Sequence, residues 1–304
     1  MSRLPEPGPH GGDGAAVAAA LGLDPSSMLD LSLSLNPVAP PVSPLLSRHL
    51  DAVSRYPDAS EATASLADAL GVDPSCVLLT NGGAEAIALL AAEMGTGWVE
   101  GPDFSLYERS LPRLDPGGPR FRSNPNNPTG RLAGPDETAA VWDEAFYPLA
   151  TGRWTRGDAA LGAVVLGSLT KLFACPGLRL GFVLAADGDL VARLARRQPR
   201  WSVNGLGAAV LPDLLATADL AGWAAGTADL RARLVGLLRS AGLEPEPSDA
   251  NFVLVNAPGL RERLAPAGIV VRDCASFGLP GYVRVAVPAE AGLARLAQAL
   301  DDAS

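Results

Sequence analysis

The sequence has little of several features that define whole classes of protein. Its three cysteines, Cys76, Cys175 and Cys274, are widely spaced and form no CxxC pair, so we expect no disulfide framework and no metal site. No apolar run reaches the roughly 18 residues that span a bilayer, and the first residues lack the apolar stretch of a signal peptide. The net charge of −9 argues against binding to nucleic acid or to an anionic membrane. We therefore expect a soluble, cytoplasmic protein.

Lysine is almost absent. Of the 24 basic residues, 23 are arginine and the one exception is Lys171. Arginine replaces lysine wherever only a positive charge is needed, but a guanidinium does not become a neutral nucleophile. A lone lysine is therefore a candidate for covalent amine chemistry such as a Schiff base, although on this count alone a leftover surface lysine fits equally well.

The sequence can form a large hydrophobic core, since 48% of its residues are hydrophobic and only 19% are charged. This suits one large domain or two modest ones. The predicted strands are 76–80, 163–167, 181–185, 251–255, 269–272 and 282–287, and the predicted helices are 84–94, 189–197, 205–216, 220–240, 260–264 and 290–300. Pro212 should bend or break the helix that contains it. The alternation predicts an α/β fold with a mostly parallel sheet, followed by a smaller α+β domain.

The residues near Lys171 favour a phosphate site. Ser168 lies three residues before Lys171, and Arg179 follows eight residues after it. The segment Gly82-Gly83-Ala84 begins a predicted helix, whose free N–H groups attract an anion. A hydroxyl, an arginine and a helix start could together enclose a phosphate dianion.

Two further residues have the chemistry to hold a heterocyclic ring. Asp143 ends an apolar stretch, and a carboxylate there can keep a pyridinium nitrogen protonated, so that the ring acts as an electron sink. Asn127 can donate to a ring phenolate oxygen. Taken singly, Asp143 fits a solvated strand end as well. Taken together with Lys171 and the phosphate site, these residues predict pyridoxal 5'-phosphate as the cofactor.

Four segments, TNGGAEAI, SNPNNPTG, WDEAF and SLTKLFACPGLRLGF, resemble the signature motifs of fold-type-I pyridoxal-phosphate enzymes, the aspartate aminotransferase superfamily. Other stretches resemble its threonine-phosphate decarboxylase branch, a close relative of the histidinol-phosphate aminotransferases. They are HGG at 10–12, LNP at 35–37, RYPD at 55–58, WSVN at 201–204, VRDCA at 271–275 and YVRVA at 282–286. The resemblance runs from His10 to about Pro288 and implies a large domain with a mostly parallel sheet, flanked by helices, plus a smaller α+β domain.

The resemblance implies roles around the cofactor. Lys171 would form the Schiff base and later carry a proton, Asp143 would pair with the ring nitrogen, and Asn127 with the ring oxygen. Phe104 or Tyr107 would stack on the ring, and the sequence leaves both open. The cofactor phosphate would be held by Ser168, Arg179 and the Gly82-Gly83-Ala84 backbone.

The resemblance also implies roles toward the substrate and a second subunit. Arg284 would bind the substrate carboxylate. Asn36 and Asn204 would line the substrate site, and His10 and Arg272 would contact a substrate phosphate, although a tail residue and a surface arginine fit these two as well. Tyr56 would reach the cofactor phosphate of the neighbouring subunit in a homodimer, although Tyr56-Pro57-Asp58 also fits an ordinary turn.

The domains expected from the resemblance are an N-terminal segment 1–39 that packs with the small domain, a large cofactor-binding domain 40–210 and a C-terminal small domain 211–304. The large domain is short. Only fifteen residues separate Tyr107 from Ser123 and twelve separate Gly130 from Asp143. Since a full crossover needs at least a dozen or so residues, we expect elements of the large domain to be shortened or missing. The third residue after Asp143 is Phe146, where many aminotransferases have a tyrosine, and WDEAF resembles the decarboxylase version.

The resemblance implies decarboxylation of L-threonine O-3-phosphate to (R)-1-amino-2-propanol O-2-phosphate, for cobalamin biosynthesis. An aminotransferase of the histidinol-phosphate type, acting on a phosphorylated amino compound, is the alternative. The orientation of the substrate carboxylate decides between the two reactions and is not readable from sequence. A third alternative is a trimmed, non-catalytic protein that only binds the cofactor.

Overall fold

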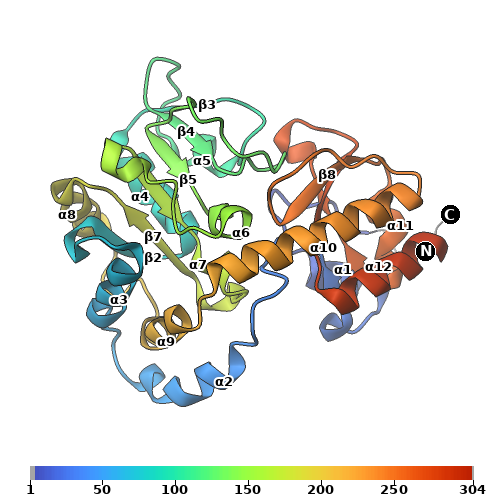
Figure 1. Ribbon diagram of the computed structural model, residues 1–304, viewed down its shortest axis with the longest axis horizontal. Coiled ribbons are helices and arrows are strands. Elements are labelled where there is room, and N and C mark those ends of the chain that lie inside the picture. Colours follow the sequence, from blue (N-terminus) through green and yellow to red (C-terminus); the bar gives the residue numbers. More distant parts are fainter. Residues whose placement is uncertain (1–3, 303–304) are drawn as a thin grey trace.

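A six-stranded sheet forms the centre of the larger body in the computed structural model, which describes residues 4–302 (Figure 1). Its strands lie in the order β2 (Val77–Asn81), β7 (Leu180–Leu184), β6 (Val164–Gly167), β5 (Val141–Asp143), β4 (Arg120–Ser123) and β3 (Trp98–Val99). Neighbouring strands from β3 to β6 are parallel, and β7 runs antiparallel to both β6 and β2. The prediction of a mostly parallel sheet is confirmed.

Both faces of this sheet are buried. Along β7, Leu180, Phe182 and Leu184 face one hydrophobic core, whereas Val183 between them faces another. Alternation of this kind follows from the two-residue period of a strand. Because both faces are covered, every residue of β7 is apolar or glycine, as is typical of central strands in α/β proteins.

Helices cover the two faces. On one face pack α4 (Gly82–Met94) and α8 (Gly188–Arg197), and on the other α3 (Ser60–Leu70), α7 (Leu169–Leu172) and α9 (Gly205–Ala216). The shorter helices of this body are α2 (Ser43–Leu46), α5 (Leu106–Ser110) and α6 (Tyr147–Thr151). The connection from β3 to β4 contains only the five-residue α5, and the connection from β4 to the parallel β5 contains no helix.

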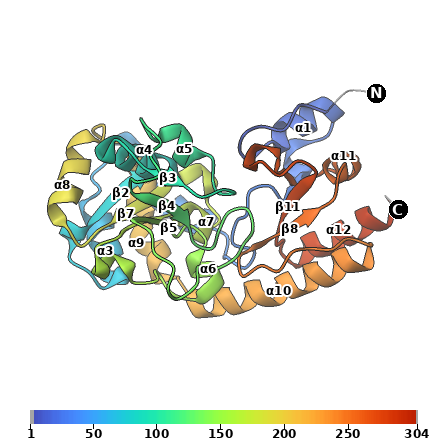
Figure 2. The ribbon, with the colours of Figure 1, turned by 90° about the horizontal axis from the view of Figure 1, so that it is seen from above.

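The smaller body surrounds a second core. It holds the antiparallel sheet β10 (Arg272–Asp273), β11 (Tyr282–Ala286) and β8 (Phe252–Asn256), and the parallel pair β1 (Leu29–Asp30) and β9 (Ile269–Val270). Its helices are α1 (Gly14–Leu21), α11 (Leu260–Leu264), α12 (Glu290–Asp302) and much of the long α10 (Leu220–Ser240). Both ribbon views show α10 running from α6 of the larger body to α12 of the smaller one (Figures 1 and 2).

The predicted strands and helices agree with the structure to within two residues at each end, with two exceptions. Residues 269–272 form two short strands, because β9 pairs with β1 whereas β10 pairs with β11, and the chain changes partner at Val271. The break expected at Pro212 is absent, and α9 runs through it, since Val210, Leu211 and Leu214 are buried on both sides of the proline and hold the helix against the core.

The predicted domain limits stay a prediction. Helix α9, which the limit at residue 210 would divide, packs entirely on the core of the larger body, and so does Trp223 in the first turn of α10. From the N-terminal segment, Leu29 and Leu31 pack into the core of the smaller body.

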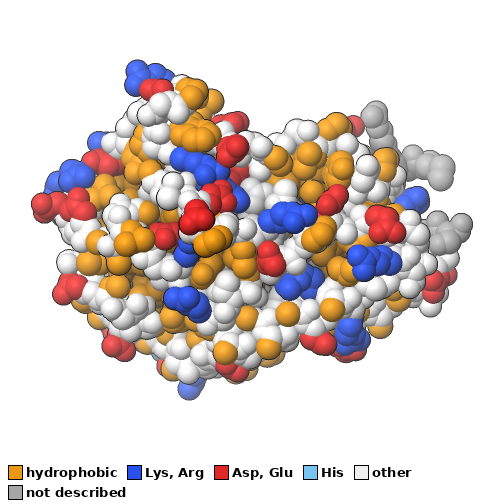
Figure 3. All heavy atoms as spheres, turned by 45° about the horizontal axis from the view of Figure 1, so that its top comes forward, with side chains coloured by type: hydrophobic (Ala, Val, Ile, Leu, Met, Phe, Trp, Pro, Cys, Tyr) orange, Lys and Arg blue, Asp and Glu red, His pale blue; other side chains and the backbone are white. Residues whose placement is uncertain are grey.

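Within residues 4–302 no single helix is long and apolar enough to cross a membrane, and α9 with α10 reach that length only together, across a bend of 86°. Acidic and basic side chains are interspersed over the face drawn in Figure 3, and neither sign gathers into one patch there.

Candidate active site

A cavity of about 280 Å³ lies at the carboxyl ends of β4, β5 and β6, where parallel sheets place their ligands. Both bodies line it. The predicted site residues around it are Lys171, Gly83, Ala84, Phe104, Tyr107, Asn127, Asp143, Ser168, Arg179, Arg284, His10 and Arg272.

Lys171 lies on the short helix α7, directly after β6. Its Nζ donates a hydrogen bond of 2.7 Å to the carbonyl oxygen of Leu33. Burial lowers the pKa of Lys171 to about 8, and the charges of Arg284 and Arg179 act in the same direction. A sizeable fraction of this amine is therefore neutral near pH 7 to 8, as covalent amine chemistry requires.

Asp143 ends β5 and is held from two sides. Its Oδ2 accepts a hydrogen bond of 2.8 Å from the Tyr107 hydroxyl, and its Oδ1 accepts the N–H of Ala145 at 3.0 Å. The Tyr107 side chain is buried, and burial raises its pKa well above the usual value. Phe104 packs edge-on against Tyr107, with ring centroids 5.6 Å apart, and is half-buried at the cavity. This geometry favours Phe104 as the ring that would stack on the cofactor, since the hydroxyl of Tyr107 is hydrogen-bonded to Asp143.

Arg284 on β11 reaches the cavity from the smaller body. Its Nη1 donates to Asn127 Oδ1 at 2.5 Å and its Nη2 to the carbonyl oxygen of Ser32 at 2.9 Å. The guanidinium lies 4.7 Å from the centre of the Phe252 ring. Within residues 4–302 no carboxylate pairs with Arg284, and its buried Nε has no partner. A buried cation without a counter-ion is costly, so this position suits a ligand carboxylate.

His10 and Arg272 lie where an N-terminal segment crosses the cavity. The His10 Nε2 is 3.2 Å from Arg109 Nη1, and burial, Arg109 and Arg272 lower the pKa of His10. Arg272 donates to the carbonyl oxygens of Gly8 and Pro9 at 2.7 and 2.6 Å, and to Ser276 Oγ at 2.6 Å. Arg272 thus holds the segment that carries His10.

The model of the family described as aminotransferase class I and II matches residues 121–300. Over 96% of this chain and 95% of the relative, the sequence is 32% identical to threonine-phosphate decarboxylase of Salmonella typhimurium. It is 28% identical to histidinol-phosphate aminotransferase 1 of Dechloromonas aromatica, over 94% of this chain and 93% of the relative.

The chain belongs to the class I and II aminotransferase family. Its fold agrees. The crystal structure of histidinol-phosphate aminotransferase from Sinorhizobium meliloti in complex with pyridoxal-5'-phosphate matches with a TM-score of 0.83 at 17% identity, covering 95% of this chain and 94% of that chain. As a member of this family, the protein is a pyridoxal-phosphate-dependent enzyme with the fold-type-I architecture.

The residues predicted to hold the cofactor phosphate pack closely together. Gly82, the first residue of α4, has φ of +73°, and a Cβ there would overlap the Arg179 guanidinium. A Cβ on Gly181 would likewise overlap the backbone of Gly82 and Gly83. Arg179 makes no ion pair or hydrogen bond with any residue from 4 to 302, which leaves its charge available to a ligand. A helix start, the Ser168 hydroxyl and a free arginine therefore fit the cofactor phosphate.

The structure does not bring four predicted site residues to the cavity wall. Gly82 packs against the Arg179 guanidinium and does not itself line the cavity. Asn36 is buried, and its Nδ2 donates to the carbonyl oxygen of Leu172 at 2.9 Å. Asn204 caps α9, and its Nδ2 donates to the carbonyl oxygen of Leu178 at 2.6 Å. Both amides are satisfied by backbone next to Lys171 and Arg179, so they support the wall of the site rather than line it. Tyr56 is 77% exposed and stacks on Trp201 at 4.3 Å.

Three residues that the sequence did not single out bear on the site. Thr170 lines the cavity and exchanges hydrogen bonds with the backbone of Leu180. Ser123 lines it beside Asn127, and buried Asp103 binds Ser123. Ser123 and Thr170 stand inside recognised motifs, which is the signal that could have found them, whereas Asp103 resembles any loop aspartate.

Proposed function

We propose that this enzyme decarboxylates L-threonine O-3-phosphate to (R)-1-amino-2-propanol O-2-phosphate and carbon dioxide in the cytoplasm, for cobalamin biosynthesis. The observation that carries the proposal is the 32% identity to threonine-phosphate decarboxylase of Salmonella typhimurium over nearly the whole of both chains. The cavity supports it with cationic groups at two places, Arg284 beside Asn127 and Arg272 beside the segment that carries His10.

The bound cofactor supplies an electron sink for the pair released when a bond to the substrate α-carbon breaks. Asp143 would keep the ring nitrogen protonated, and Tyr107, which donates to its Oδ2, fixes the orientation of that carboxylate. Asn127 has its Oδ1 occupied by Arg284, so its Nδ2 is the group that donates to the ring oxygen.

Arg284 selects which bond breaks, because it binds the substrate carboxylate. If the carboxylate is held for cleavage, its bond to the α-carbon would break, carbon dioxide would leave with both carboxylate oxygens, and the electron pair would stay behind. Lys171 or water then delivers one proton to the α-carbon. The Nζ of Lys171 lies in the cavity and its pKa is about 8, so near neutral pH it can give or take a proton.

A second candidate function is transamination of a phosphorylated amino compound. It is favoured by the 28% identity to histidinol-phosphate aminotransferase 1 of Dechloromonas aromatica. In that case Arg284 would still bind the carboxylate, and Lys171 would remove the α-proton instead.

The test is product analysis. The enzyme loaded with pyridoxal phosphate is given L-threonine O-3-phosphate, and separately histidinol phosphate with 2-oxoglutarate. The proposal predicts (R)-1-amino-2-propanol O-2-phosphate from the first and no glutamate from the second. Glutamate from the second mixture, with no amine product from the first, would replace the proposal by the second candidate.

The enzyme works as a homodimer in this proposal, with Tyr56 reaching the cofactor phosphate of the second subunit. The 3₁₀ helix Ser47–Ser54 has three residues per turn, so Leu50 and Val53 project from one face. They are 56% and 71% exposed, and the stacked pair Tyr56 and Trp201 is exposed after them. A second copy of this chain is the occupant proposed for these apolar side chains. Sedimentation of the wild type should give a dimer. The Tyr56→Phe variant should bind the cofactor more weakly but should still sediment as a dimer.

A further inference from the structure

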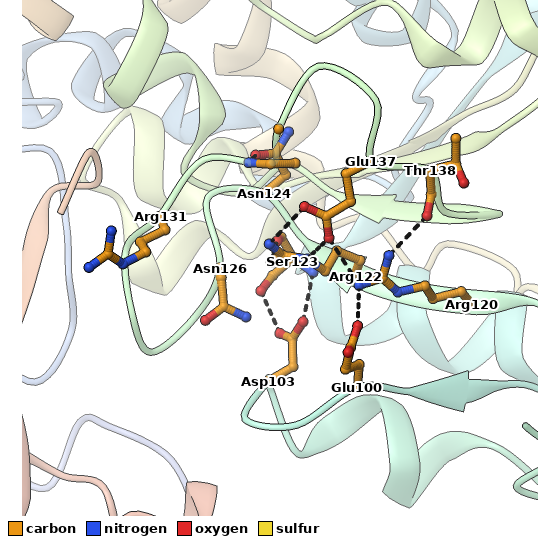
Figure 4. Close-up of polar contacts among 12 residues, drawn as sticks. Glu100, Asp103, Arg120, Arg122, Ser123, Asn124, Asn126, Arg131, Glu137 and Thr138 are labelled. Atoms are coloured by element: carbon orange, nitrogen blue, oxygen red, sulfur yellow. Dashed lines mark hydrogen bonds and ion pairs between the residues drawn. The ribbon is translucent and has the colours of Figure 1, made fainter. Parts of the chain in front are cut away.

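A buried carboxylate lies behind the cavity wall. Asp103, in the turn after β3, is only 7% exposed. It accepts the backbone N–H of Phe104 at 2.7 Å. It also accepts the backbone N–H of Ser123 at 3.0 Å and the Ser123 hydroxyl in a close contact (Figure 4). One side chain thus joins the segment that carries Phe104 to the end of β4.

The contact continues toward the cavity through Ser123. Because the Ser123 hydroxyl gives its proton to Asp103, its oxygen is free to accept, and it accepts the backbone N–H of Asn127 at 2.8 Å. Asn127 in turn accepts from Arg284. Among the described residues nothing hydrogen-bonds to Asn127 Nδ2. The chain of contacts therefore leads from Asp103 to the amide that is aimed at the cofactor.

The need for this support follows from the short connection between β4 and β5. Residues 124–140 join the two parallel strands without a helix to hold them. Charged side chains hold them instead. Glu137 accepts from Arg120 at 2.9 Å and from Arg122 at 2.7 Å, which ties the far end of this connection back to β4 (Figure 4). Asp103, through Ser123, holds the end of this connection that follows β4, where Asn127 lies.

We propose that Asp103 is a positioning residue that acts through Ser123 to hold the Asn127 amide and the Phe104 ring against the pyridoxal phosphate ring. This rests on the cofactor contacts given under the proposed function, but not on which reaction follows. Asp103 itself touches neither cofactor nor substrate.

The ionised form of Asp103 is the one that serves this purpose, since it accepts three hydrogen bonds and a protonated carboxyl would offer a competing donor. Burial raises the pKa of Asp103 to about 6, opposed by the Ser123 and Phe104 contacts and by the charge of Arg122 on β4. Tyr107 on α5 is the other titratable group facing it, and Asp143 on β5 lies beyond Tyr107.

The test uses the visible absorbance of the bound cofactor, which needs no substrate. An Asn127 donor stabilises the deprotonated ring oxygen, so its displacement should raise the pH midpoint of the absorbance change. For Asp103→Asn we expect a rise of about 0.5 to 1 pH unit, the size of one hydrogen bond. The control is Asp115→Asn, which removes an aspartate that accepts the N–H of Gly117 in an exposed turn and should leave the midpoint unchanged.

If Asp103→Asn folds poorly, Ser123→Ala tests the same proposal, because it removes the Ser123 hydroxyl that connects Asp103 to Asn127. Ser123→Ala should raise the pH midpoint by the same amount. The double variant should raise it no further than either single variant, since both residues act along one path. A midpoint equal to that of the wild type in folded Asp103→Asn, or in Ser123→Ala, would overturn the proposal. Failure of the decarboxylase assignment would leave these spectra unaffected, so the two results are separable.

Discussion

The Arg284 guanidinium donates a hydrogen bond of 2.5 Å to the side-chain oxygen of Asn127. Arg284 comes from β11 of the smaller body and Asn127 from the segment after β4 of the larger one. The residue proposed to bind the substrate carboxylate therefore touches the residue proposed to bind the cofactor ring. This contact links the two bodies at the point where the bond to be broken must be oriented.

Replacing Arg284 by lysine should weaken substrate binding more than cofactor binding. Lysine keeps the positive charge but loses the planar fork that can hold a carboxylate and Asn127 at once. We expect KM for L-threonine O-3-phosphate to rise roughly 10- to 100-fold, as for the loss of one charged hydrogen bond. Steady-state kinetics and a cofactor titration measure the two effects, with Arg239→Lys on the surface as control. An unchanged KM would contradict the assignment of Arg284.

Removing Lys171 should abolish covalent attachment of the cofactor. Since Lys171 is the only lysine, Lys171→Ala and Lys171→Arg leave no side-chain amine. Borohydride reduction followed by mass spectrometry should find pyridoxal phosphate on wild type only. The double variant Lys171→Ala with Arg131→Lys returns a lysine at an exposed position and should stay unmodified. A fixed adduct in either single variant speaks against the scheme.

The rate of cofactor attachment to the apoenzyme should rise with pH and level off above about 8, the pKa of Lys171. The sign follows from the chemistry, because only the neutral amine attacks and its fraction grows as the pH rises through the pKa. Among the neighbouring charges, Arg284 lowers the pKa of Lys171 the most, so Arg284→Met should raise this pKa and move the plateau to higher pH. Stopped-flow absorbance measures both profiles. A wild-type rate that keeps rising to pH 10 would show an ordinary lysine.

Gly82→Ala should impair cofactor binding. Its φ of +73° is strained for alanine, and the new Cβ would meet the Arg179 guanidinium. Displacing Arg179 would cost its charged hydrogen bond to the phosphate, which corresponds to a rise in the cofactor Kd of about 10- to 100-fold. Gly177→Ala is a matched control two residues from Arg179, because its Cβ would enter open space. Equal Kd values for the two variants would exclude the proposed phosphate site.

The sequence indicated three of the six strands of the large sheet, β2, β6 and β7, and most of the cavity residues, because these have local signals, whereas the short strands β3, β4 and β5 were missed. Buried strands such as Val164–Gly167 are apolar runs, and Lys171, Asn127 and Asp143 stand in motifs whose spacing is fixed by the turns that end β4, β5 and β6. Because β4, β5 and β6 are neighbouring parallel strands, their carboxyl ends bring these residues together at one edge of the sheet.

The misplaced residues depend on partners far away in the chain. Whether Asn36 faces the cavity or the backbone of Leu172 is decided by packing across 136 residues. Arg272 does line the cavity, but its carbonyl partners lie more than 260 residues earlier. A satisfied amide or guanidinium looks the same in sequence as a ligand-binding one. Asp103 was missed for the same reason, since only the fold shows that it is buried against Ser123.

The most direct test of the central claim uses L-threonine O-3-phosphate labelled with ¹³C in the carboxylate. The enzyme loaded with pyridoxal phosphate should release one labelled carbon dioxide for each substrate consumed, with the cofactor absorbance unchanged after turnover. Consumption without labelled carbon dioxide, together with conversion of the cofactor to pyridoxamine phosphate, would contradict the decarboxylase and identify an aminotransferase.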